Sequence, residues 1–229
     1  MLSKDEFRSL AFSTDTGTIN DDYHAKMFYL MAWTGMRGQE LRALTIDDID
    51  FDKHNIRINK AATEVKNEDY GKNDKPKVLT IPLPPKTKSS RRRIGMNDVA
   101  EGLVEQLINM RPNKDSNLIC QNSHGEMISK RSFAKFFDST LKRAGIEKKG
   151  RGGHCLRHTF ISYAFDLRES TDFHAKFYTP MVGHSPLFIS KYVGHSDLSV
   201  TLRIYAHISG EELEDIEFNT LELDDEDKL

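Results

Sequence analysis

The sequence is poor in cysteine, with only Cys120 and Cys155 among its 229 residues. This content is too small for a disulfide framework and lacks the spacing of a zinc site, so we expect a reducing, cytoplasmic setting. The chain also lacks an apolar run of membrane-spanning length, and its N-terminus is not a signal peptide, so we expect no membrane association. It contains neither a glycine-rich phosphate loop nor a cluster of metal ligands. These absences predict chemistry that requires no metal and no cofactor.

Charge is divided unevenly along the chain, although the net charge is only −2. Residues 211–229 hold 10 of the 35 acidic side chains and 1 of the 33 lysines and arginines. Residues 1–210 therefore carry 32 basic against 25 acidic side chains, a net charge of +7. A basic body permits binding to a polyanion, and the acidic tail is either a solubilising end or a docking element.

Hydrophobic periodicity predicts helices on both sides of a few short strands. The capping-box pattern of Ser3 and Glu6 begins a helix that extends to about Phe12. Further helices are expected at 20–33, 36–44, 97–110, 129–144, from 154 past 163 and from 197 to about 205, and strands at 55–59, 78–81 and 91–94. The second strand is expected to end at Pro82. This order predicts an α+β fold, a helix-dominated mixed domain with a small antiparallel β-sheet.

Three motifs contain the side chains that can do chemistry. They are TGMRGQEL at 34–41, HCLRHT at 154–159 and VGHSDLSVTLRIYAH at 193–207. When a nucleophile attacks a phosphodiester, negative charge accumulates on the nonbridging oxygens. Arginine suits these oxygens because its planar fork donates two hydrogen bonds and stays charged, and Arg37 and Arg157 are the candidates. Tyr205 is the candidate nucleophile, and it needs nearby cations and a base to become reactive.

In these motifs the chain resembles the tyrosine recombinases of the phage integrase family, over about residues 10–207. The resemblance implies that Tyr205 attacks DNA while the other site residues surround the phosphate. These are the arginines Arg37 and Arg157, the histidines His154 and His195, and Glu40, which holds its arginine in place. His154 would assist proton transfer or bind the phosphate, and His195 would donate a hydrogen bond to it. We expect His158 to be structural and buried.

The tetrapeptide VGHS occurs twice, at 182–185 and at 193–196, which we interpret as a small duplication in a loop. It lengthens the interval before the second copy relative to the family pattern. His195 is preferred to His184 because ten residues separate it from Tyr205, as the family pattern requires. Tyr192 would be the nucleophile only if the first copy were the true motif.

The run PKTKSSRRR at 85–93 is strongly basic and suits contacts with phosphates. It resembles the β-hairpin turn in which the family carries a lysine that protonates the departing sugar oxygen. The Lys-Thr pair identifies that lysine as Lys86, with Lys88 as the alternative. The side chains of the run that we expect to contact DNA are Lys88, Arg91, Arg92 and Arg93.

We expect a tyrosine recombinase catalytic domain over 1–210, followed by an acidic C-terminal tail over 211–229. The core-binding and arm-binding domains that precede this domain in the family are expected to be absent, because Arg37 lies so near the start. Apolar residues that recur among the acids predict that 211–223 packs on a protein surface. Double-stranded DNA is the expected partner, with a tetramer on DNA and a monomer alone.

The sequence thus predicts site-specific DNA recombination by cleavage through Tyr205, a 3′-phosphotyrosyl intermediate, strand exchange and religation. A type IB topoisomerase shares this chemistry but reseals the same strand. From another class, the alternative is a DNA-binding relative of the recombinases that does not cut. The full set of arginine, histidine and tyrosine residues argues against that alternative.

Overall fold

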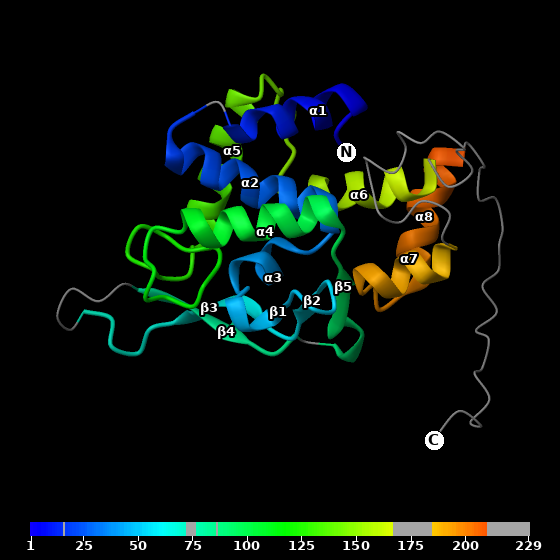
Figure 1. Ribbon diagram of the computed structural model, residues 1–229. Helices are drawn as coiled ribbons and strands as arrows, with labels where there is room; N and C mark the ends of the chain where they lie inside the picture. The colour runs from blue at the N-terminus through cyan, green and yellow to red at the C-terminus, as the bar shows by residue number, and fades with distance from the viewer. Residues whose placement is uncertain (16, 72–76, 86, 167–184, 210–229) are drawn as a thin grey trace.

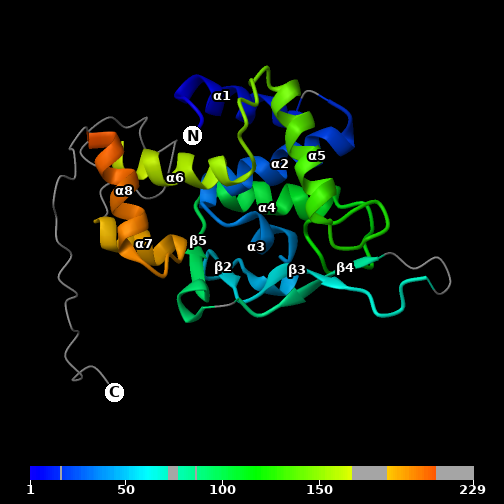
Figure 2. The ribbon, with the colours of Figure 1, turned by 180° about the vertical axis from the view of Figure 1, so that it is seen from behind.

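The computed structural model describes residues 1–15, 17–71, 77–85, 87–166 and 185–209. Helix α2 (Ile19–Thr34) lies at its centre, with α1 (Lys4–Phe12) and α5 (Lys130–Arg143) on one side and the β-strands on the other (Figures 1 and 2). Helix α4 (Asp98–Met110) packs against α2. This arrangement confirms the predicted helix-dominated α+β fold. Within the described residues, no helix is long and apolar enough to cross a membrane.

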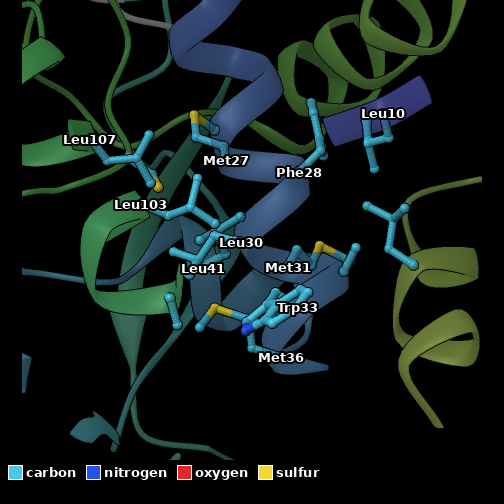
Figure 3. Close-up of a cluster of buried hydrophobic side chains, with 14 of the residues drawn as sticks. Leu10, Met27, Phe28, Leu30, Met31, Trp33, Met36, Leu41, Leu103 and Leu107 are labelled. Carbon is cyan, nitrogen blue, oxygen red and sulfur yellow. The ribbon is translucent and has the colours of Figure 1, made fainter. Parts of the chain in front are cut away.

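Helix α2 is apolar on almost every side, and 10 of its 16 residues are buried. Its N-cap is Thr18, and it ends at Gly35, whose left-handed φ of 65° only glycine adopts without strain. Figure 3 shows its core side chains beside those of neighbouring elements, among them Leu30, Met31, Trp33, Met36 and Leu41. The segment that carries the first motif is therefore built directly onto the main core.

The strands form two small antiparallel sheets. Strands β1 (Ile49–Asp50), β2 (Asn55–Ile58) and β5 (Arg92–Gly95) make one sheet, in the order β1-β2-β5. Strands β3 (Ala61–Lys66) and β4 (Val78–Leu83) form a separate pair. β3 was not predicted, and β4 continues through Pro82, where it was expected to end. Pro82 is tolerated there because β4 is an edge strand of its pair among the described residues.

The remaining helices lie at one end of the molecule. Helix α6 (His154–Asp166) packs against α2 and extends from there to α7 (Pro186–Val193) and α8 (Leu198–Ser209) (Figure 1). A second, smaller core joins α6 to α7 through Phe160, Ile161, Ala164, Phe165, Ile189 and Val193. Helix α7 also contacts β5, so the helical end and the sheet meet beside the first motif.

Helix α7 corrects our interpretation of the repeated VGHS as a duplication in a loop. The serine of the first copy, Ser185, is the N-cap of α7, and Pro186 occupies its first turn. The glycine of the second copy, Gly194, ends the helix with a left-handed φ of 73°. Ser185 of the first copy and Gly194 of the second therefore mark the two ends of one helix. His184 lies outside the described residues.

Candidate active site

Arg37 is the N-cap of the short helix α3 (Gly38–Arg42), not a residue within a longer helix as predicted. Its backbone N–H donates to Glu40 Oε2 at 2.8 Å, and its Nη1 donates to Glu40 Oε1 at 3.0 Å. Its other guanidinium nitrogen, Nη2, donates to the Gly194 carbonyl at 2.7 Å. The side chain remains 27% exposed. Arg37 is thus fixed from two directions while part of it can still reach a ligand.

Glu40 connects Arg37 to a second arginine. Its carboxylate is 2% exposed and accepts from Arg92 Nη1 at 2.8 Å and Arg92 Nη2 at 2.9 Å, a bidentate pair. Burial alone would raise the pKa of Glu40, but the hydrogen bonds and charge of Arg92, reinforced by Arg37, lower it. Glu40 is therefore ionised at neutral pH, and its contact with Arg37 agrees with its expected position.

Arg92 does not lie where a DNA contact would require. Its side chain is 6% exposed, and besides Glu40 it binds the Tyr192 carbonyl through Nε at 2.7 Å. Arg91 and Arg93 are exposed, whereas Arg92 and Ile94 face inward. The alternation of a β-strand explains the difference, because successive side chains point to opposite faces. That alternation was the signal in the sequence that would have separated Arg92 from its neighbours.

Arg157 is almost fully buried, with 4% exposed surface. Its Nη1 donates to the Gly35 carbonyl at 2.8 Å, and its Nη2 has no hydrogen-bond partner in the described part of the chain. Burial, together with the positive charges of Arg37 and Arg92, lowers the pKa of Arg157 well below its ordinary range. A guanidinium stays charged in proteins, so this shift indicates a cation that would be stabilised by an anion.

His154 begins α6, so it lies one helical turn before Arg157. Burial, and then the charges of Arg157 and Arg37, lower its pKa. The His158 ring lies 6.1 Å from the His154 ring, centre to centre. His158 is exposed, so the expectation that it is buried was wrong. The turn of α6 that was expected to face the core carries it outward instead.

His195 follows the glycine that ends α7 and is only partly exposed. Its Nδ1 lies 2.7 Å from the hydroxyl of Thr201, a fully buried residue of α8. Burial lowers the pKa of His195 to about 3, and the charges of Arg157 and Arg37 add to the effect. His195 is therefore neutral at physiological pH. Thr201 was not among the predicted site residues, because nothing in the motif distinguishes it from an ordinary helical threonine.

The structure brings together Arg37, Glu40, Arg157, His154 and His195. Tyr205 belongs to α8, but its side chain lies outside the described part of the structure, as do Lys86 and the side chain of Lys88. The rival tyrosine, Tyr192, is partly buried. Its hydroxyl donates to the Gly95 carbonyl at 3.1 Å, and its ring stacks on Phe160. Burial raises its pKa, which disfavours the phenolate.

Two hollows open beside Arg37. One, of about 590 Å³, is lined by apolar side chains such as Phe133 and Phe137 and by charged ones such as Arg42, and His154 is part of its lining. The other, of about 460 Å³, is more polar and includes Thr87 and Ser90 of the basic segment together with Ser196. Arg37 and Lys130 line both. Arg37 is thus accessible from the surface on which Thr87 and Ser90 lie, whereas Arg157 lines neither hollow.

Comparison with known proteins assigns the chain to a family. The model of the phage integrase family matches residues 1–212, and the chain belongs to this family. It is 28% identical over 199 residues to a XerC-like tyrosine recombinase of Caldanaerobacter subterraneus subsp. tengcongensis, covering 81% of this chain and 46% of that protein. It is 26% identical over 222 residues to the tyrosine recombinase XerD of Listeria innocua, covering 94% and 60%. The chain thus spans about half of the length of these relatives.

Solved structures show the same fold. The integrase of transposon Tn1549 in complex with circular intermediate DNA superposes with a TM-score of 0.68 at 22% identity, over 90% of this chain and 62% of that one. The XerA recombinase gives 0.60 at 22% identity, over 93% and 59%. A lambda integrase dimer bound to a core site gives 0.53 at 15% identity, over 95% and 62%. These likenesses confirm the fold.

Proposed function

We propose that this chain is the catalytic part of a site-specific DNA recombinase that cuts and rejoins strands through Tyr205. The observation that carries the proposal is the buried guanidinium of Arg157. Its Nη2 lacks a partner among the described residues, and its charge lowers the pKa values of His154 and His195. Positive charge of this kind suits the extra negative charge of a phosphorane.

In the proposed reaction the Tyr205 oxygen attacks the phosphorus of a DNA phosphodiester. The tyrosine proton leaves to His154 or water, a phosphorus–tyrosine bond forms, and the bond from phosphorus to the 5′-oxygen breaks. Lys86 donates a proton to that oxygen, which departs as a 5′-hydroxyl. A 5′-hydroxyl from another strand then attacks the phosphorus of the 3′-phosphotyrosyl group and gives its proton to Lys86, while the bond to Tyr205 breaks and the tyrosine oxygen regains a proton from His154 or water. The phosphodiester energy is retained throughout, so no cofactor is required.

The surrounding groups stabilise charge on the nonbridging oxygens. Arg157 would donate from Nη2 and Arg37 from its exposed part, and neutral His195 would donate from Nε2. We further propose that double-stranded DNA is the partner, that four copies assemble on it, that the free chain is monomeric and that it acts in the cytoplasm. Residues 1–210 would supply this activity, and 211–229 would pack on a protein surface.

The test is the capture of a covalent adduct. A library of nicked duplexes with randomised sequence is incubated with the chain, and complexes that survive denaturation are isolated and sequenced. We expect an adduct with the wild type and with Tyr192→Phe, and none with Tyr205→Phe. An adduct that persists in Tyr205→Phe and disappears in Tyr192→Phe would transfer the nucleophile to Tyr192.

Two rival functions predict other outcomes. A DNA-binding relative that does not cut would shift the labelled duplex without forming any adduct. A type IB topoisomerase would form the adduct but would reseal the duplex that it cut and would not exchange strands between two duplexes. Exchange of strands between two labelled duplexes therefore distinguishes the recombinase from both.

A further inference from the structure

Arg92 joins three segments that are distant in the sequence. Its side chain begins on β5, pairs with Glu40 of α3 and binds the Tyr192 carbonyl near the end of α7. The pair with Glu40 spans 52 positions and the bond to Tyr192 spans 100. All of these contacts are made by one side chain that is 6% exposed. Arg92 therefore has its donors engaged inside the protein and directed away from solvent.

The groups that bind Arg92 also hold Arg37 and the turn before His195, two of the residues proposed to bind the phosphate. Glu40 shares its carboxylate between Arg92 and Arg37, and Arg37 in turn donates to the Gly194 carbonyl. Tyr192 and Gly194 belong to the same turn, which continues directly into His195. Arg92 and Arg37 thus hold this turn through two neighbouring carbonyls, with Glu40 bridging the two arginines.

Close packing at Gly194 also holds the turn before His195 in place. A Cβ placed on Gly194 would lie 2.9 Å from the Ser89 carbonyl oxygen and 3.2 Å from Arg92 Cδ. The turn before His195 is therefore pressed directly against the start of β5, with no room for a side chain between them. The contact surface and the hydrogen bonds of Arg92 fix the same relative position of these two segments.

We propose that Arg92 is a positioning residue: by holding Glu40 and the Tyr192 carbonyl, it sets the places of Arg37 and His195, and it does not contact DNA. The inference rests on the proposed function, because it concerns the geometry of that site. Arginine is required for the role, since its planar fork serves both carboxylate oxygens and the carbonyl at once. Lysine would supply the charge but not the three directed bonds.

The experiment separates positioning from DNA contact. Arg92→Gln, Arg92→Lys and the wild type are compared for duplex affinity over a range of salt concentrations and for the single-turnover rate of adduct formation. Arg57→Gln is the matched control, because Arg57 is an exposed arginine on the adjacent strand β2 and its loss removes the same charge. Thermal unfolding establishes that each variant is folded at the assay temperature.

We expect Arg92→Gln to lower the rate of adduct formation by about 10- to 100-fold, the effect of losing a buried charge-assisted pair. Arg92→Lys should recover little of this loss. Affinity, and its dependence on salt, should match those of Arg57→Gln. A decrease of about one in the salt slope beyond that of Arg57→Gln would mark Arg92 as a phosphate contact and would overturn the inference.

A pH profile provides a readout that a general loss of stability would not move. Burial raises the pKa of Glu40 and Arg92 counteracts it, so Arg92→Gln should shift the protonation of Glu40 to higher pH. As the pH is lowered, adduct formation should then be lost at a higher pH in Arg92→Gln than in the wild type. An unchanged profile, or a full recovery by Arg92→Lys, would contradict the proposal. Duplex affinity and its salt slope can be measured without cleavage. A chain that formed no adduct would therefore refute the proposed function, and these two measurements would still decide whether Arg92 contacts DNA.

Discussion

Replacement of Thr201 by valine should slow DNA cleavage without disturbing the fold. Valine has nearly the shape of threonine but lacks the hydroxyl that lies 2.7 Å from His195 Nδ1. When the hydroxyl donates to Nδ1, the neutral ring carries its proton on Nε2 and can donate it to a phosphate. Because the pKa of His195 is lowered to about 3, its ring is neutral at physiological pH. The tautomer of that neutral ring then decides which nitrogen is a donor.

The size of the effect follows from the loss of one buried hydrogen bond. Thr201 is fully buried, so water cannot replace its hydroxyl without rearrangement. Such a loss, with one partner left unpaired, costs about 1–2 kcal/mol, which corresponds to about 5- to 30-fold in rate if it falls on the transition state. Thr201→Ser retains the hydroxyl and should cleave at nearly the wild-type rate.

The assay is single-turnover formation of the covalent adduct, supported by ¹⁵N spectra of the imidazole nitrogens. The spectra distinguish a protonated nitrogen from an unprotonated one, so they report the His195 tautomer directly. Thr140→Val is the control for removing a buried helical hydroxyl, because Thr140 lies on α5. If Thr201→Val cleaved at the wild-type rate with an unchanged tautomer, Thr201 would be a packing residue only.

Three further outcomes are expected. Burial lowers the pKa of His24 from 6.5 to about 4, so stability should fall as the pH drops below 6.5, by about 2 kcal/mol between about pH 7 and 5, and denaturant titrations of His24→Gln should show a smaller fall. Substituting sulfur for the leaving 5′-oxygen, which removes the need for a proton, should restore cleavage by Lys86→Ala but not by Arg157→Ala. Gly194→Ala should lower the melting temperature more than Gly150→Ala, because both glycines have a positive φ but only Gly194 abuts other atoms. Equal responses of Lys86→Ala and Arg157→Ala to the sulfur substitution would refute Lys86 as the proton donor. Equal melting temperatures of Gly194→Ala and Gly150→Ala would refute the close packing at Gly194.

Much of the fold could be predicted because its signals are local. Ser3 and Glu6 form the expected capping box, and α4 and α5 begin where helices were expected, with Asn97 and Ser129 as their N-caps. Each of these caps depends on side chains within three residues of one another, a distance at which spacing fixes geometry. The i, i+3 relation of Arg37 and Glu40 belongs to the same class, and the structure pairs them.

The rest depends on contacts between distant segments, which spacing does not encode. The alternation of a strand separates Arg92 from Arg91 and Arg93, but only the partners of β5 show that the Arg92 side is the one that faces inward. Helix α7 was not predicted because it spans only eight residues, too few for a helical period to stand out between the two copies of the repeated tetrapeptide. His158 was expected on the buried side of α6, but which face of α6 is covered depends on its packing against distant elements.

The electrostatics of the site explain why so many of its bonds are internal. Three arginines, Arg37, Arg92 and Arg157, lie close enough to affect the pKa of the same groups, and among the described residues that hydrogen-bond them Glu40 is the only carboxylate. One negative charge cannot balance three positive ones, so the cluster keeps a surplus of positive charge in a partly buried place. Like charges repel there, and the Gly35, Tyr192 and Gly194 carbonyls offset the repulsion by accepting hydrogen bonds from the arginines. A phosphate would complete the balance. A protein that paired every arginine with its own acid would be more stable, but it would have no remaining attraction for the charge that develops on a phosphorane.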